Sequence, residues 1–549
     1  MTRSAPSVGL SVAVALLLGA CGSDDGGAPP PPIGMTGGTG PPSGLSAGGA
    51  TGGGGGDPAC MPGGAGSGGS SGLPKFDVGG TGGVDLPVSC EELDAARSNL
   101  GCVFWAVDLP NDWNGTDKSP PAAEQPFAVV VANTSSLTAA GVAVYVGDGT
   151  TPIDAATVDV DDTVTFVLDG GDVSGQVPGA DGTAFRIESD VPVTAYQFNP
   201  LDNTNPVYSN DASLLFPEHV LGKEHAVLAG DGIWLSMGAE DPMPDPVGAF
   251  VSVVAVEDGT HVTVEPSVPV LAGPVEDVSL ARGRVLTVLA DVTAGDGNLS
   301  GSRISSDRPV AVFAGNVATA EPVAANVCCA DHIEHAIPPI DVWGTTYVVV
   351  PPPAAGGDGD DPYVLRITAA YDDTDLGYCP KRPEGAPDAL DGFTVETVQL
   401  EEPVVLRSDD PEKPIFVAQF LESQGALPGN GQGYGDPAMI VVPPVAQFER
   451  KYVFAVPDGY GGGNYVTVVT ADPAGVELDG AAVTTTFAEA GVAFERTYFY
   501  AHLPVAPGAH RIACDGGCGI RVVGYDEAVS YGYPGGAGLS IIAVPPVAG

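Results

Sequence analysis

Positive charge is scarce in this sequence. The 549 residues include 20 Lys and Arg against 69 Asp and Glu, for a formal net charge of -49. A surface this acidic repels phosphate backbones, so we expect no nucleic-acid partner. The same charge favours solubility, divalent cations or basic partners.

Long apolar runs are also missing after the first part of the chain. No later segment stays apolar for the roughly 18 residues that a membrane-spanning helix requires. No long stretch repeats its apolar residues at the helical period, and no Ser-His-Asp set, metalloprotease helix or phosphate-binding loop can be recognised. These absences argue against a helical membrane protein and against the enzyme classes that carry these motifs.

The N-terminus has the features of an export signal. Arg3 provides positive charge, Val8 to Leu18 form a short apolar stretch, and Leu18-Gly19-Ala20-Cys21 follows. This ending resembles the bacterial lipobox, so residues 1–20 are expected to be a lipoprotein signal peptide and Cys21 the lipidated residue. The protein would then be lipid-anchored in the cell envelope of a bacterium, at the outer membrane, facing the surface or the periplasm. An ordinary secretory signal is the alternative.

Residues 21–89 are rich in Gly, Pro and Ser and contain hardly any bulky side chains. Such a segment cannot bury enough apolar surface to offset the entropy of ordering, so we predict a disordered tether. The folded body is expected to span residues 90–549.

The body contains four copies of one pattern, at approximately residues 102–223, 224–345, 346–450 and 451–549. Each copy has a hairpin, clearest at Asp258-Gly259 between two alternating runs. Each also has an aspartate that predicts a tight turn between two strands, as in Ser189-Asp190 and Ser408-Asp409. The fold class is therefore all-β, with about six strands in each repeat. A propeller-like assembly is favoured, with tandem β-sandwiches as the alternative.

Several segments together resemble one family. They are GCVFWAVDLPND from Gly101, RIESDVPVTAYQFNP from Arg186, SNDASLLFP from Ser209 and CCADHIEHAIPPIDVWGTTYVV from Cys328. Their order is similar to that of the IgGFc-binding protein N-terminal domain, over about Cys90 to Gly549. The resemblance implies an extracellular interaction module.

With Cys21 lipidated, eight cysteines remain, an even number in an exported protein. Short spacing predicts that Cys90 pairs with Cys102 and Cys514 with Cys518. Cys328 and Cys329 are vicinal, so one or both are expected to reach Cys379 or Cys60.

Metal binding is a minor alternative for this chain. Cys328, Cys329, Asp331, His332 and His335 could form a zinc site, but oxidised cysteines beside surface histidines are the favoured interpretation. Three acidic clusters could bind calcium weakly, and no other cofactor is expected. They are Asp159, Asp161 and Asp162; Asp358, Asp360 and Asp361; and Asp372, Asp373 and Asp375.

Two functions from different classes follow from these features. The first is a surface-tethered binding or adhesion lipoprotein that presents loops of a β-scaffold to an extracellular protein or glycan and is not an enzyme. Its candidate contact residues are Tyr208, Trp234 and Tyr434, aromatics in polar surroundings rich in Gly and Pro. The alternative is an exported hydrolase with acidic residues in a central cleft, for which no catalytic residue can be named.

Overall fold

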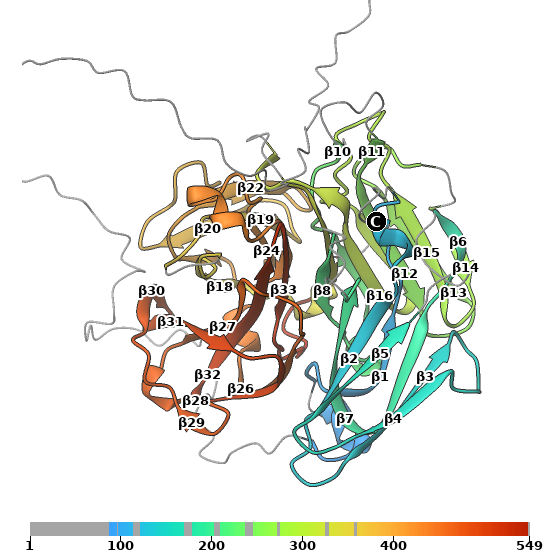
Figure 1. The fold of residues 1–549 in the computed structure, drawn as a ribbon. Coiled ribbons are helices and arrows are strands. Elements are labelled where there is room, and N and C mark those ends of the chain that lie inside the picture. The colour runs from blue at the N-terminus through green and yellow to red at the C-terminus, as the bar shows by residue number, and fades with distance from the viewer. Residues whose placement is uncertain are drawn as a thin grey trace, which may run out of the picture.

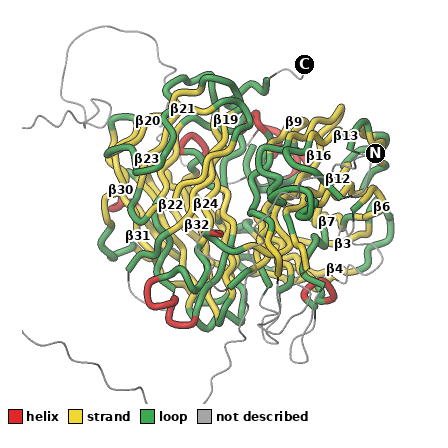
Figure 2. Tube along the Cα trace, turned by 90° about the horizontal axis from the view of Figure 1, so that it is seen from above, coloured by secondary structure: helices red, strands yellow, loops and turns green. Residues whose placement is uncertain are grey.

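Antiparallel strands make up almost all the regular structure, as expected for an all-β protein (Figure 2). The computed structural model describes residues 87–95, 97–113, 121–168, 178–201, 209–235, 245–271, 275–323, 329–355 and 359–546. Helical segments within these ranges are short 3-10 turns such as η2 (Cys90–Ala95). No helix in the described ranges is long and apolar enough to cross a membrane.

The first unit is built around one long strand, β7, that belongs to two sheets. The first half of β7 lies between β1 and β3, and its second half lies between β2 and β8. Strands β4 and β5 extend the two sheets. The strands are β1 (Gly101–Ala106), β2 (Phe127–Asn133), β3 (Ala140–Val146), β4 (Asp154–Val158), β5 (Thr163–Leu168), β7 (Phe185–Asn199) and β8 (Asp211–Leu214).

The second and fourth units repeat this connectivity around their own long strands. The second unit comprises β9 (Gly222–Ala226), β12 (Ala249–Ala255), β13 (Thr260–Glu265), β14 (Val278–Leu280), β15 (Arg284–Leu289), β16 (Arg303–Thr319) and β17 (Asp331–Ala336). The fourth comprises β26 (Glu449–Val456), β27 (Gly463–Thr470), β28 (Val476–Leu478), β29 (Ala481–Ala482), β31 (Arg496–Val505), β32 (Gly508–Asp526) and β33 (Val529–Pro534).

In the third unit the long strand is divided in two, so its sheets separate into two four-stranded sheets. They are built from β18 (Thr346–Val349), β19 (Tyr363–Ala369), β20 (Thr374–Cys379), β21 (Ala389–Leu390), β22 (Val395–Leu400), β23 (Val404–Ser408), β24 (Ile415–Leu421) and β25 (Met439–Val441). Four further strands lie outside the common pattern: β6 (Gly179–Thr183), β10 (Ile233–Leu235), β11 (Asp245–Val247) and β30 (Ala488–Ala493).

The predicted turn at Ser189-Asp190 is wrong, because β7 continues through these residues. The register of β1 against β7 shifts here, which marks a bulge. The Ser189 hydroxyl donates to the Val191 carbonyl at 2.7 Å, and Asp190 accepts from the Gly141 amide of β3 at 2.7 Å. The bulge thus passes one strand from the first sheet to the second.

The other units treat this position in different ways. β16 also runs unbroken, and its Ser306 hydroxyl donates to the Arg308 carbonyl at 2.7 Å. In β32 a disulfide between Cys514 and Cys518 spans the bulge where the other units use a serine hydroxyl. Only the third unit breaks, at residues Asp409 to Pro414, where the Lys413 amide donates to the Asp410 carbonyl at 3.1 Å and closes a turn.

The last strand of each unit meets its counterparts at the centre of the molecule. β8 contacts β17 and β33, and β25 also contacts β17 and β33, so the four strands form a closed ring of neighbours. In Figure 1, β8 and β33 lie where the first two units (blue to green) meet the last two (yellow to red). The favoured propeller is nevertheless wrong, because a propeller blade is a single four-stranded sheet. The sheets here form two nearly closed barrels and a half-barrel. Their apolar interior is shared between units, because one buried cluster includes Phe104, Phe250 and Phe454 of the first, second and fourth units.

The two ends of the body close the ring between the first and fourth units. Asn99 donates its backbone amide to the Ala537 carbonyl at 3.1 Å and accepts from the Ala537 amide at 3.0 Å. The Arg97 guanidinium donates to the Leu539 carbonyl at 3.1 Å. Farther inside, the Tyr196 ring of the first unit packs 4.8 Å from the Tyr533 ring of the fourth.

This closure predicts that the four units unfold together. Deleting residues 537–549 from the full chain should lower the temperature of a single calorimetric transition by several degrees, because Asn99 and Arg97 lose their partners across the ring. Replacing Asn133 by Ala is the control, since the Asn133 amide donates only within the first unit. Separate transitions for individual units in the intact chain would contradict a closed ring.

Candidate functional site

A buried carboxylate joins the four central strands at one end of the ring. Asp211, the first residue of β8, accepts the backbone amides of Ala212, Glu334, Met439 and Gly532 at 2.8, 3.1, 2.9 and 3.1 Å. These amides belong to β8, β17, β25 and β33 respectively. One side chain with no solvent exposure therefore holds a donor from every unit.

Two more aspartates lie at the same end. Asp331 accepts the amides of Asn210 and His332, each at 2.8 Å, and makes a longer contact of 3.4 Å with the Ser530 amide. Asp436 accepts the amides of Gln424 and Cys329 at 3.0 and 3.2 Å. Both side chains are fully buried. Each aspartate thus links its own unit to a neighbour.

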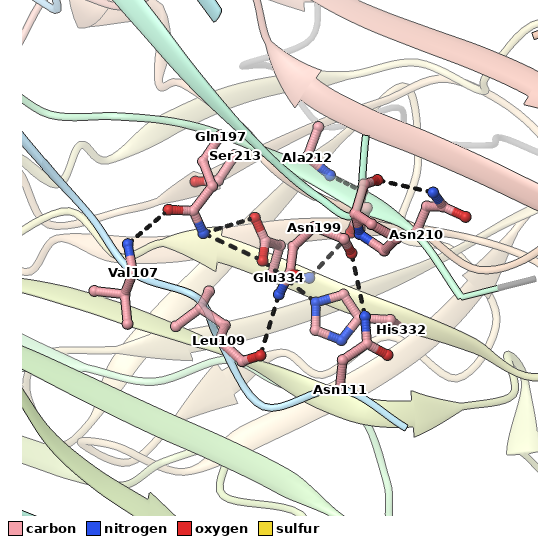
Figure 3. A network of polar contacts seen from close by, with 12 residues as sticks. Val107, Leu109, Asn111, Gln197, Asn199, Asn210, Ala212, Ser213, His332 and Glu334 are labelled. Carbon is pink, nitrogen blue, oxygen red and sulfur yellow. Dashed lines mark hydrogen bonds and ion pairs between the residues drawn. The ribbon is translucent and has the colours of Figure 1, made fainter. Parts of the chain in front are cut away.

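A polar network on β17 extends inward from these aspartates (Figure 3). The Gln197 amide of β7 donates to Glu334 at 3.1 Å, and the Gln197 carbonyl oxygen accepts from the Val107 amide at 2.9 Å. Glu334 lies 3.3 Å from Nε2 of His332, whose ring stacks on Phe250 at a centroid distance of 5.8 Å. The network connects the first and second units through side chains.

Burial determines the protonation of these groups, because it removes their charged forms from bulk solvent. It raises the pKa of Asp211, Asp331 and Glu334 well above the ordinary range, although hydrogen bonds oppose the shift. It lowers the pKa of His332 to about 3 and that of His335 to about 4. The raised pKa of Glu334 favours its protonated form, which can donate to the neutral imidazole of His332.

The arrangement is not accessible to a substrate. Asp211, Asp331, His332, Glu334 and Asp436 have no exposed surface. A cavity of about 30 Å³ lies at the opposite end of the central strands, lined by apolar residues such as Leu214, Trp343 and Pro444. A general acid or base must reach its substrate within hydrogen-bonding distance, so these acids cannot act as the expected hydrolase pair.

The structure separates most of the predicted zinc ligands. β17 is a strand, so Asp331 and His335 point to one face and His332 to the other. Cys328 lies outside the described residues, and Cys329 is in a disulfide. The described ranges contain no group of three or more His, Cys, Asp or Glu side chains that could hold a metal ion. This finding covers the described members of the three acidic clusters as well.

Two predicted disulfides are present in the structure. Cys90 is bonded to Cys102 and Cys514 to Cys518. Cys329 and Cys379 are also disulfide-bonded. The lipidation candidate Cys21 and the remaining cysteine Cys60 lie outside the described residues.

Comparison with known proteins identifies the family. A family model described as IgGFc binding protein matches residues 211–524, more than half of the chain and all but one of the central strands. The chain belongs to the IgGFc-binding protein family. The human IgGFc-binding protein is 26% identical over 369 residues, which cover 66% of this chain but only 6% of the human protein. No solved structure matches the chain.

The structure does not bring together the residues that were predicted to contact a binding partner. Trp234 is half-buried on a two-stranded ribbon of β10 and β11, opposite Pro246. Tyr434 is half-buried between the third and fourth units, where a Cβ on Gly462 would lie 2.8 Å from its ring. Tyr208 lies outside the described residues.

One set of three side chains in this chain has the order hydroxyl, imidazole and carboxylate that is found in catalytic triads. The Thr467 hydroxyl lies 2.8 Å from Nδ1 of His502, and Nε2 of His502 lies 3.2 Å from Asp360. Thr467 is only 2% exposed in the middle of β27, so it is unsuitable as a nucleophile. We interpret the three residues as a link between a loop of the third unit and the fourth unit. They are far apart in sequence, so spacing gave no signal for them.

The buried network predicts a pH-dependent effect at Glu334. Glu334→Gln keeps an acceptor for Gln197 and stays neutral, whereas Glu334→Ala removes the acceptor of the Gln197 side-chain NH2 and the partner of His332 Nε2 and should cost about 2–4 kcal/mol. Because folding raises the pKa of Glu334, its stabilising contribution is complete below the unfolded pKa and is lost as pH rises through the folded pKa.

Denaturant titrations of the full chain at several pH values would measure this effect. The Gln variant should match the wild type at acidic pH and exceed it at alkaline pH. A Gln variant that is less stable than the wild type at alkaline pH would show that Glu334 is ionised in the folded protein.

Proposed function

We propose that this protein is an extracellular binding or adhesion lipoprotein. In this proposal Cys21 anchors it to a bacterial envelope, residues 22–89 form a tether, and the ring presents loops to a protein or glycan partner. The observation that carries the proposal is the family match over residues 211–524, because the curated relative is a protein named for binding. The lipobox-like N-terminus supports the location.

The ring brings corresponding connections of the four units to one end. In each unit the segment between the long strand and the last strand begins and ends there, because Asn210 contacts Asp331, Cys329 contacts Asp436, and Asp436 donates its amide to the Ser530 hydroxyl. We define the axial loop face by the described residues 209–210, 320–323, 329–330, 422–438 and 527–528. Most of these residues are buried; the exposed ones are Glu527 and, in the turn η8 (Pro428–Gly433) that leads into the half-buried Tyr434, Pro428, Gly429, Gln432 and Gly433.

The hydrolase alternative has weaker support. It requires an accessible acid pair, but the acids that meet at the centre are buried and hold backbone amides. Loops projecting from a rigid β-scaffold are a common arrangement for binding surfaces. Binding through the axial loop face is therefore the function that we favour.

Array binding of the full chain tests this proposal. The protein should bind a discrete set of extracellular proteins or glycans, and Tyr434→Ala should weaken binding about tenfold or more, as truncation of an aromatic contact residue does. Tyr371→Ala is the matched control, since Tyr371 lies outside the axial loop face and its hydroxyl donates to the Val544 carbonyl. Thermal unfolding would verify that both variants fold. Turnover in a hydrolase panel without binding on any array would contradict the proposal.

Lipid anchoring can be tested separately. Cys21→Ser should abolish fatty-acid labelling and release the protein from bacterial membranes, because no thiol would remain at the lipobox position. Cys60→Ser is the control, and it should leave labelling and membrane association unchanged. Membrane association of the unlabelled Cys21→Ser variant would disprove the anchor.

A further inference from the structure

Among the described residues, no positively charged side chain pairs with the three buried aspartates beside the axial loop face. Asp211, Asp331 and Asp436 are fully buried. No Lys or Arg is among the charges that influence their pKa values, and the charges that act on Asp331 are those of Asp211 and Asp436 themselves. Buried carboxylates need a cation, strong hydrogen bonds or a proton. Each of the three aspartates must therefore have a cation, strong hydrogen bonds or a proton.

Backbone amides account for Asp211 but not for the other two. Each Asp211 oxygen accepts two amides, so its hydrogen-bonding capacity is filled. Oδ2 of Asp331 has only the long contact with the Ser530 amide, at 3.4 Å. Oδ2 of Asp436 is buried and has no hydrogen-bond partner within the described structure. Each of the two aspartates thus has an oxygen available for another ligand.

Two neutral oxygens nearby are also unpartnered. The Tyr460 hydroxyl is buried without a partner in the described residues, and its pKa is raised first by burial and then by the charges of Asp331 and Asp211. Tyr460 is 6% exposed, and its ring packs 4.6 Å from that of Tyr531, the neighbour of Ser530. Oδ1 of Asn210 is buried and unpartnered as well, in the residue whose amide binds Asp331.

We propose that Asp331 and Asp436 share one divalent cation of the calcium class, with the Tyr460 hydroxyl and the Asn210 amide oxygen as neutral ligands. Only oxygens are offered, which suits calcium and disfavours zinc. The described part of the chain holds no cluster of three or more acidic, His or Cys ligands, so two carboxylates supply the charge and water completes the shell. Calcium tolerates such irregular, partly hydrated coordination better than magnesium does.

The cation would join all four units at the base of the axial loop face. Its ligands come from the first unit (Asn210), the second (Asp331), the third (Asp436) and the fourth (Tyr460). Binding should therefore stabilise the ring as a whole and order the segments that begin there. The inference is independent of the proposed function, because the site can be measured without any binding partner.

Calorimetric titration of the chelator-treated full chain with calcium chloride tests the site. We expect one calcium ion per chain. We also expect calcium to raise the unfolding temperature by about 2 °C or more. Asp436→Asn should abolish both effects, and without calcium it should be at least as stable as the wild type, because it removes an uncompensated charge.

Asp373→Asn is the matched control. It removes a charge from an exposed acidic turn, where Asp373 has a φ of 52° that Asn also adopts. This variant should keep the ion and the thermal shift. Absence of binding to the wild type, or equal loss in both variants, would overturn the proposal, the latter by assigning calcium to the surface turns.

Discussion

The carboxylate of Asp211 is the contact on which the ring depends most. It accepts one amide from each of β8, β17, β25 and β33, so it fixes the last strand of every unit relative to the other three. Without this acceptor, four amides in a dry interior would lose their partner, and each unsatisfied group costs about 1–3 kcal/mol. Apolar packing also joins the units, because single buried clusters include residues of several of them, and the carboxylate fixes the relative positions of their last strands.

Local patterns in the sequence predicted the fold class but not how strands pair or continue. Asp258-Gly259 does form a turn between β12 and β13, with Gly259 at a φ of 65°, but the predicted hairpin is wrong, because the two strands pair with different parts of β16 and not with each other. Ser189-Asp190 has the same turn chemistry, yet the partner of Asp190 is Gly141 on a distant strand, which makes a bulge rather than a reversal. The propeller was wrong for a related reason, because sequence does not show that one strand can serve two sheets.

The axial end illustrates why site prediction had only partial success. Asp331, His332 and His335 were selected as possible metal ligands, while Asp211 and Glu334 were passed over. All five are fully buried, and burial sets their protonation and their roles. An acid precedes or opens the last strand in three units, at Asp211, Asp331 and Asp436, and aligning the repeats on that feature would have indicated the cluster. The backbone donors that satisfy them cannot be read from side-chain identities.

Strand β6 has a further consequence for how this chain can be divided. It lies between β5 and β7 in sequence, yet it pairs with β15 of the second unit. The first unit therefore supplies an edge strand to its neighbour's sheet. An expression fragment cut at the sequence repeats, near residue 224, would leave β15 with an open hydrogen-bonding edge that invites aggregation. A soluble fragment of the second unit must begin before Gly179 and so carry part of the first, which makes the repeats poor modules for recombination.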